Sequence, residues 1–160
     1  MSIQTSIGTP TATSYISVAS ATEYFNTRES SDEWLDMGST GTLSKTTRQE
    51  NLLKQAVREN DRTFRFFNGK YNQGLRGATD YQALEFPRTT DTDTDGNLLI
   101  PYDVQYAQCE QALWILQRGA TRYTQEGNQV NSPFIAEDAY NYLRPYINRQ
   151  VEKVGVYKWQ

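Results

Sequence analysis

Residues 82–116 read QALEFPRTTDTDTDGNLLIPYDVQYAQCEQALWIL, and this stretch decides the fold that the sequence predicts. Its short apolar segment from Leu84 to Pro87 suits a strand, which the proline would end. The acidic turn that follows contains Asp95-Gly96, a dipeptide typical of two-residue hairpin loops. A second apolar segment then leads to Pro101, which suits the first position of a helix. We therefore expect a small β-hairpin over about residues 83–100.

The helix expected from Pro101 to about Arg118 is the most apolar segment of the chain. It carries apolar residues on nearly every side, which is typical of a helix at the centre of a domain. Cys109, the only cysteine, lies within this helix and is expected in the core. With one cysteine and no histidine, the chain lacks an internal disulfide, a cysteine zinc site and a histidine base. We expect neither an enzyme nor a bound cofactor.

Three further helices are predicted from N-capping residues and apolar spacing: one from Ser17 or Ser20 to about Arg28, one from Ser44 to about Phe66, and one that opens at Ser132-Pro133 and ends near Pro145. Residues 29–43 are expected to be a polar loop that Trp34 anchors to the core. The predicted fold class is mainly α, with a four-helix bundle-like core, the small β-hairpin and extended arms at both ends.

The domain organisation follows from the two ends of the chain. Residues 1–14 are rich in Ser and Thr and are expected to form a flexible arm, followed by one helical domain over residues 15–149. Residues 150–160 are apolar and prone to β-structure, so they are expected to form an arm that docks on a partner or packs back on its own domain. The candidate contact residues of this arm are Val151, Lys153, Val154, Val156, Tyr157 and Trp159.

The charge distribution leaves two interpretations of the second predicted helix open. The net charge of -3 and the pI near 5.0 argue against a protein that binds nucleic acid over a broad basic surface. The helix is nevertheless rich in cations, among them Arg58, Arg62 and Arg65. They could form a nucleic-acid face or a solvated surface with local ion pairs to acids such as Asp61. Because acids are interspersed among the cations, we favour the solvated surface.

The acidic turn also resembles the opening of a calcium loop. Asp91, Asp93 and Asp95 occupy the first, third and fifth positions, but Tyr102 stands where a closing carboxylate is required. We expect an exposed hairpin tip here, with a divalent-cation site at these three aspartates as the alternative. The glycines that follow the second helix lack the GK[ST] element of a phosphate loop. No apolar run approaches the length of a membrane span, and a soluble protein made in the cytosol is expected.

A series of short motifs carries a family resemblance over about residues 15–116: Tyr15-Ile-Ser-Val-Ala, Leu53-Lys-Gln-Ala56 with Asp61, Phe67-Asn-Gly69-Lys70, Gln82-Ala-Leu-Glu-Phe-Pro-Arg88, Asp95-Gly96, Ile100-Pro101 and Val104-x-x-Ala107-x-x-Glu110-x-Ala112. The chain is similar to the head–tail adaptor, or connector, proteins of tailed bacteriophages. It resembles in particular a group labelled as being like a primosomal single-stranded-DNA-binding protein. The element from Gln82 to Arg88, followed by Asp-Gly and Ile-Pro, is the most specific part of the resemblance.

The resemblance implies a non-enzymatic structural protein of the virion neck, made in the cytoplasm of the bacterial host. Such adaptors form a ring beneath the portal, often dodecameric, which extends the DNA channel and joins the next neck or tail component. The genome would only pass through the lumen, and no membrane is involved. The C-terminal arm from Val151 to Trp159 is then the expected portal contact. The alternative is a single-stranded DNA-binding module that uses Arg58, Arg62 and Arg65.

Overall fold

The computed structural model describes residues 2–73, 81–118 and 135–148, and these ranges confirm a mainly helical fold. In chain order the elements are α1 (Val18–Asn26), α2 (Asp32–Leu35), α3 (Lys45–Thr63), α4 (Tyr102–Arg118), α5 (Glu137–Leu143) and the 3-10 helix η2 (Arg144–Tyr146). Within the described ranges the chain forms isolated β-bridges, and none of them extends into a β-strand. No helix in these ranges has both the length and the apolar character needed to cross a membrane.

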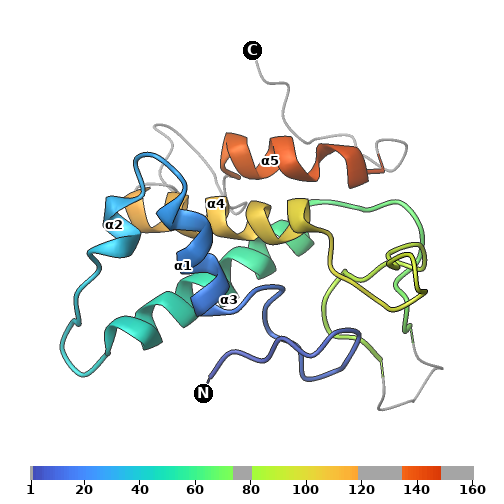
Figure 1. The fold of residues 1–160 in the computed structure, drawn as a ribbon, viewed down its shortest axis with the longest axis horizontal. Helices are drawn as coiled ribbons and strands as arrows, with labels where there is room; N and C mark the ends of the chain where they lie inside the picture. The colour runs from blue at the N-terminus through green and yellow to red at the C-terminus, as the bar shows by residue number, and fades with distance from the viewer. Residues whose placement is uncertain (1, 74–80, 119–134, 149–160) are drawn as a thin grey trace, which may run out of the picture.

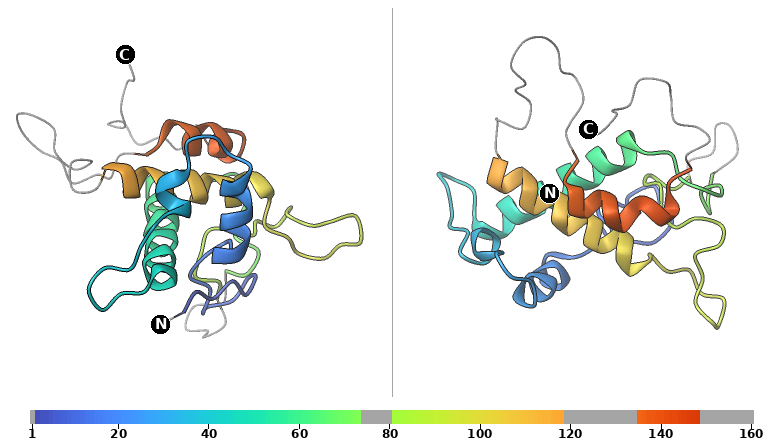
Figure 2. Two further views of the ribbon diagram at one scale, coloured as in Figure 1. Left: turned by 60° about the vertical axis from the view of Figure 1, so that its left-hand side comes forward. Right: turned by 90° about the horizontal axis from the view of Figure 1, so that it is seen from above.

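Helix α4 is the central element, as its all-round apolar sequence predicts. It packs against each of the other four α-helices. Figure 1 shows α5 lying above α4 and α3 crossing below it, and Figure 2 shows the same order from two further sides. Two clusters of buried side chains meet at α4, one containing Val104 and Ala107 and the other Cys109, Ala112 and Leu113. The fold is therefore organised in layers around one buried helix.

Two buried glutamines of α4 join elements that are distant in the sequence. Gln108 donates to the carbonyl oxygen of Leu53 at 2.8 Å and accepts from the backbone N–H of Tyr15 at 3.0 Å. Gln111 accepts from the backbone N–H of Ala136 at 2.8 Å, just before α5 begins. Because a buried amide without partners is costly, these bonds fix how neighbouring segments sit on α4.

The helix boundaries differ from the sequence prediction at the end of α3. The helix begins after Ser44, whose hydroxyl accepts from the backbone N–H of Thr47, as expected of an N-cap. It ends at Thr63 and does not continue to Phe66, because Phe64 is extended and Phe66 forms an antiparallel bridge with Ile147. Pairing with a segment more than 80 residues away thus ends the helix early.

Two other predicted segments are corrected. Residues 29–43, expected to be a loop, contain the short helix α2, in which Trp34 is fully buried against Phe25 with ring centroids 4.9 Å apart. Helix α5 begins at Glu137, after Ala136 as its N-cap residue. The predicted helix start at Ser132-Pro133 falls outside the described residues.

The β-hairpin expected over residues 83–100 does not form as a ladder. Only Thr92 and Leu98 form a bridge, around a turn in which the carboxylate of Asp93 accepts from backbone N–H groups. The first expected strand pairs elsewhere: the N–H of Tyr71 donates to the carbonyl oxygen of Pro87 at 3.0 Å, and Lys70 forms a bridge with Arg88. The segment therefore joins the loop after α3 and leaves the turn on its own.

Residues 82–88, which we call the signature loop, are held by their own buried side chains. The side-chain amide of Gln82 donates to the carbonyl oxygens of Leu84 and Pro87, and its oxygen accepts from the N–H of Asn72. The guanidinium of Arg88 donates to the carbonyl oxygens of Phe66, Phe67, Asn68 and Glu85 and to the Glu85 carboxylate. Gln82 and Arg88, which belong to the most specific part of the family resemblance, thus hold neighbouring segments of the fold together.

The two ends of the chain were expected to be arms. Residues 2–14 fold back on themselves, with the N–H of Thr13 donating to the carbonyl oxygen of Gln4 at 2.8 Å. They also contact the signature loop, because the carbonyl oxygen of Thr9 accepts from the N–H of Ala83 at 3.1 Å. The expected C-terminal arm, residues 150–160, lies outside the described residues, and so do its candidate contact residues from Val151 to Trp159.

Candidate nucleic-acid interface

The acidic side chains in the second half of α3 are occupied inside the protein. Glu59 is 7% exposed and accepts from the side-chain amides of Gln55 at 3.1 Å and Gln111 at 2.8 Å. Asp61 accepts from the hydroxyl of Tyr15 at 2.7 and 2.9 Å and from the N–H of Glu85 at 3.0 Å. Neither carboxylate is therefore turned to the outer surface of the helix.

Burial also shapes the chemistry of Asp61. It raises the pKa of this carboxyl to about 7, against the lowering effect of the hydrogen bonds from Tyr15 and from the Glu85 N–H. The same hydroxyl of Tyr15 accepts from the N–H of Phe86 at 3.2 Å. Asp61 is thus a structural anchor between α3, the N-terminal segment and the signature loop, and it is not a partner for the surface arginines.

The arginines of the same half of α3 point the other way. Arg58 and Arg62 are exposed and lie one helical turn apart, and Arg65 is exposed just beyond the helix end. Within the described ranges, none of these three side chains forms an ion pair, a hydrogen bond or a ring contact. The local ion pairs between these arginines and Asp61 that the sequence suggested are therefore wrong. We call Arg58, Arg62 and Arg65 the arginine face.

The cations at the start of α3 behave differently. The ammonium of Lys45 donates to the carbonyl oxygen of Leu35 at 2.5 Å, and the guanidinium of Arg48 donates to that of Gly38. These groups hold the loop that precedes the helix. Lys45 and Arg48 at the start of α3 thus stabilise the fold, whereas the guanidinium groups of Arg58 and Arg62 near its end have no partner among the described residues.

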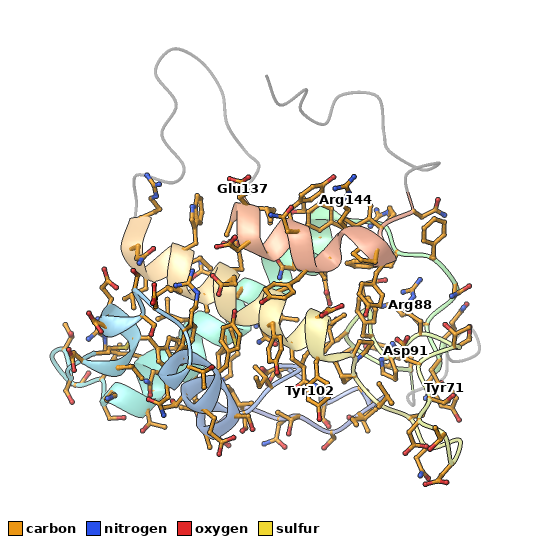
Figure 3. The ribbon with its side chains drawn as sticks, turned by 45° about the horizontal axis from the view of Figure 1, so that its top comes forward. Tyr71, Arg88, Asp91, Tyr102, Glu137 and Arg144 are labelled. Atoms are coloured by element: carbon orange, nitrogen blue, oxygen red, sulfur yellow. The ribbon has the colours of Figure 1, made fainter. Side chains whose placement is uncertain are left out.

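The chain around Arg65 contacts α5 and the residues that follow that helix. The carbonyl oxygen of Arg65 accepts from the N–H of Asn148 at 2.7 Å, and Phe67 beside it is 46% exposed. Phe64 packs against Tyr140 of α5, with ring centroids 5.9 Å apart. One turn after Tyr140, the exposed Arg144 stands at the outer end of α5 (Figure 3).

Sequence reasoning did not identify Arg144 or the inward orientation of the acids. The inward orientation of the acids could have been inferred from their spacing. Glu59 lies three residues after Ala56, and Asp61 lies four residues after Val57. Both Ala56 and Val57 belong to the apolar stripe of α3, so this spacing places the acids on its flanks.

The acidic turn carries the other predicted site residues. The carboxylate of Asp91 accepts from the N–H of Arg88 at 2.7 Å, and that of Asp93 accepts from the N–H groups of Asp95 and Asn97 and from the side-chain amide of Asn97. These bonds lower the pKa of Asp93, whereas burial raises that of Asp91. Among the described residues, no cluster of Asp, Glu, Cys or His is arranged to hold a metal ion.

The arrangement suits electrostatic contact with an anion. Cys109 is buried in the core as predicted, and burial raises the pKa of its thiol, which opposes the reactive thiolate form. The arginine face by contrast presents guanidinium groups to solvent, and these bind phosphate oxygens readily. This surface can therefore bind an anion.

The chain is similar to a known protein family. The sequence model of the family described as "Putative DnaT-like ssDNA binding protein" matches residues 1–137. No curated protein and no solved structure matches the chain. Because the family match covers most of the sequence, the chain belongs to this DnaT-like family.

Proposed function

We propose that this protein binds single-stranded DNA through the arginine face of α3. The observation that carries the proposal is the segregation of charge along the helix. Glu59 and Asp61 take their hydrogen bonds inside the protein, while Arg58 and Arg62 face solvent without a partner in the described ranges. The description of the family also names single-stranded DNA binding.

The surroundings of the arginine face favour single strands over duplex DNA. Proteins that bind single strands without sequence preference combine cations along the backbone with aromatic rings on which bases stack. The exposed Phe67 follows Arg65 and offers one such ring. Because the net charge of the protein is -3, attraction is limited to this local patch, and binding is expected to be highly sensitive to salt.

The test measures the binding of a fluorescein-labelled oligothymidine to the full-length protein by fluorescence anisotropy at low and physiological salt. Binding at low salt should weaken about tenfold or more when Arg58, Arg62 and Arg65 are all changed to Glu, since repulsion then replaces attraction to phosphate. Neutralising Arg58 and Arg62 with Gln should also reduce the slope of log K against log salt by about 1.4, at about 0.7 for each phosphate contact.

The matched control is Lys45→Glu, compared with Arg62→Glu. Both reverse one charge on α3, but Lys45 lies at the opposite end of the helix and bonds to a carbonyl oxygen. Arg62→Glu should weaken binding and Lys45→Glu should not. No anisotropy change at low salt, or equal losses in the two variants, would contradict DNA binding at the arginine face.

A second candidate function is that of a structural head–tail adaptor in the neck of a tailed phage. It rests on the sequence resemblance and on the large apolar side chains that the described surface exposes, among them Tyr71 at 53%, Tyr81 at 52% and Tyr102 at 72%. Exposed aromatic residues are typical of protein–protein contacts. In this function the chain forms a non-enzymatic ring, dodecameric like the portal, through which the genome passes to the next neck or tail component.

The adaptor function is tested by deleting Val151–Gln160, the proposed portal-contacting arm. The shortened protein should keep its thermal stability but no longer join portal-containing particles in electron micrographs. If it still assembles into necks, this arm is not the portal contact. Ring formation by the purified protein in the absence of DNA would favour the adaptor over the DNA-binding function.

A further inference from the structure

A row of tyrosines crosses the surface where three helices meet, and we call Tyr24, Tyr102, Tyr106 and Tyr142 the tyrosine row. The rings of Tyr24 and Tyr106 are stacked with centroids 4.6 Å apart, and those of Tyr102 and Tyr106 are stacked at 6.0 Å. Tyr142 meets Tyr106 edge-on at 5.8 Å. Tyr102 is 72% exposed and the other three are partly exposed, so the row presents aromatic surface to solvent.

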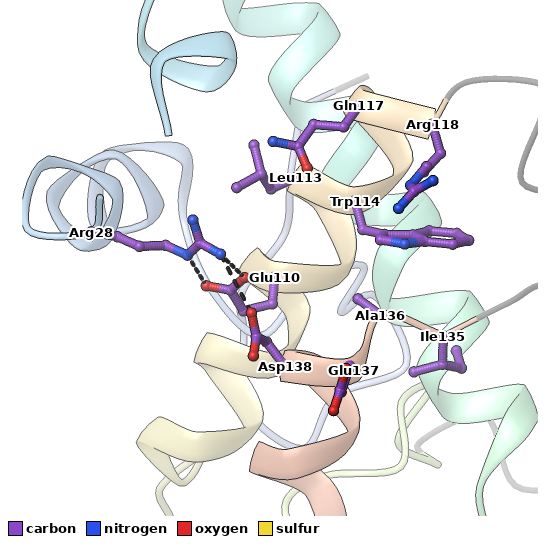
Figure 4. Close-up of a pocket in the computed structure, with 10 residues that line it drawn as sticks. All are labelled: Arg28, Glu110, Leu113, Trp114, Gln117, Arg118, Ile135, Ala136, Glu137 and Asp138. Atoms are coloured by element: carbon purple, nitrogen blue, oxygen red, sulfur yellow. Dashed lines mark hydrogen bonds and ion pairs between the residues drawn. The ribbon is translucent and has the colours of Figure 1, made fainter. Parts of the chain in front are cut away.

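Helical spacing explains why the row ends in a group of charges. On α4, Glu110 lies one turn after Tyr106. Arg28 follows Tyr24 of α1 by four residues and lies just beyond the end of that helix. On α5, Asp138 lies one turn before Tyr142. The three charged residues therefore gather at one end of the row, where Arg28 contacts Glu110 at 2.8 Å and Asp138 at 3.5 Å (Figure 4).

A cleft of about 470 Å³ adjoins this charged end. Its walls include the apolar side chains of Leu113, Trp114 and Ile135, and Glu137 and Asp138 also line it (Figure 4). The side chain of Asp138 is 63% exposed, whereas that of Glu110 is 5% exposed and accepts from the hydroxyl of Tyr24 at 2.5 Å. The cleft thus combines apolar walls with accessible carboxylates.

The charges around the row and the cleft are mainly negative. Arg28 is engaged by two carboxylates, and Arg118 at the far side of the cleft also has an interaction partner. The acids around them include the exposed Glu23 and Glu137. Phosphates would be repelled here, whereas arginine and lysine side chains can place their charge over tyrosine rings and on carboxylates.

We propose that the tyrosine row and its adjoining cleft form a docking surface for a basic, arginine- or lysine-bearing segment of a protein partner. Charge complementarity selects this occupant over nucleic acid, and the largely exposed ring of Tyr102 favours a cationic side chain over a purely polar one. The surface lies on α1, α4 and α5, and the arginine face lies on α3. The peptide-docking proposal and the DNA-binding proposal therefore concern different surfaces and can be tested independently.

The experiment measures the binding of a fluorescein-labelled hexa-arginine peptide to the full-length protein by fluorescence anisotropy. Tyr102→Ser and Asp138→Asn should each weaken binding about fivefold to tenfold, because one removes an open ring and the other an accessible carboxylate. Both side chains are largely exposed, so both variants should melt at the temperature of the unmodified protein. No binding of the peptide, or full binding by both variants, would overturn the proposal.

The matched control removes one negative charge elsewhere. Asp95→Asn alters an exposed carboxylate of the acidic turn, and peptide binding should stay within about twofold of the unmodified protein. An equal loss in Asp95→Asn and Asp138→Asn would show attraction to net charge alone and would overturn the proposal. Binding of labelled oligothymidine by the Arg58→Glu, Arg62→Glu variant that is lost when Tyr102 is also changed to Ser would assign the row to nucleic acid and would also overturn the proposal.

Discussion

The signature loop and the arginine face both depend on arginine, and they use it in opposite ways. Arg88 in the signature loop is 7% exposed, and its guanidinium is surrounded by carbonyl oxygens of its own chain and by Glu85. Arg58 and Arg62 on α3 are exposed and have no partner in the described ranges. A buried guanidinium must have its donors satisfied, whereas an exposed one can bind a ligand at little cost.

This contrast separates the residues that carry most of the family resemblance from those that we propose to bind a ligand. The side chains at the two ends of the specific motif, Gln82 and Arg88, make their hydrogen bonds to other groups within the fold. The proposed binding residues occur in a common pattern, arginines one turn apart on a polar helix face. Here the more specific motif marks the scaffold, and the less specific pattern marks the surface that is free to bind.

The largest expected effect is at Arg88. Arg88→Ala should lower the free energy of unfolding by about 3–5 kcal/mol, because it leaves the buried carbonyl oxygens of Phe66 and Phe67 without their donor. The Glu85 carboxylate also loses one of its two cations and keeps only Lys70. Urea denaturation measures the change. Arg88→Lys keeps the charge without the planar set of donors and should lose less. A loss under about 0.5 kcal/mol for Arg88→Ala would place the guanidinium in the same class as surface arginines.

The sequence predicts the parts of the fold that depend on neighbouring residues. Ser44 identifies the start of α3, and the apolar character of α4 identifies the central helix. For α1 the sequence left Ser17 and Ser20 as alternatives, and the helix begins after Ser17. Contacts between distant residues were not predictable in this way. The end of α3 is set by the pairing of Phe66 with Ile147. The expected hairpin is reduced to the single bridge between Thr92 and Leu98, because the signature loop pairs with residues 70 and 71.

The candidate site shows the same limit. The arginines of α3 were visible as a possible nucleic-acid face, but their freedom depended on where Asp61 pointed. That orientation is fixed by the hydroxyl of Tyr15, 46 residues away in the chain. A residue's type can be read from the sequence, but whether its charge is already engaged depends on the packed structure.

The next effect concerns the pH dependence of stability at Asp61. Its pKa of about 7 in the folded protein lies above the ordinary value of 3.8, so the folded state keeps a proton that the unfolded state loses between about pH 4 and pH 7. Stability should therefore fall as pH rises through this window, by up to about 1.4 kcal/mol per pH unit.

The comparison with Asp61→Asn isolates this contribution. The amide oxygen of Asn can still accept from Tyr15 and from the Glu85 N–H but does not titrate, so thermal melts of the variant should depend less on pH between pH 4 and pH 7. Subtracting the two curves removes the contributions of Asp91 and Asp93, which both proteins share. Parallel curves would show that Asp61 does not titrate in this window.

A smaller effect is expected at the start of α3. Ser44→Ala removes the hydroxyl that accepts from the N–H of Thr47 and should lower the free energy of unfolding by about 1 kcal/mol. Urea denaturation again gives the value, and Ser44→Asp, which keeps an acceptor at the N-cap, should restore stability. Oligothymidine binding should stay unchanged in both variants, since the arginine face lies at the other end of the helix. A change in binding equal to that of Arg62→Glu would mean that the whole helix, and not its end, makes the contact.

The smallest change in stability is expected at the arginine face itself. Arg58→Gln together with Arg62→Gln should alter the free energy of unfolding by less than about 0.5 kcal/mol, because neither guanidinium has a partner to lose. The same double variant should bind oligothymidine more weakly at low salt, so a ligand phenotype without a stability phenotype is the expected result. A loss of stability comparable to that of Arg88→Ala would mean that these arginines are structural as well. The distinction between the interior and the surface arginines depends on this measurement, since exposure alone does not show that a charge is available for binding.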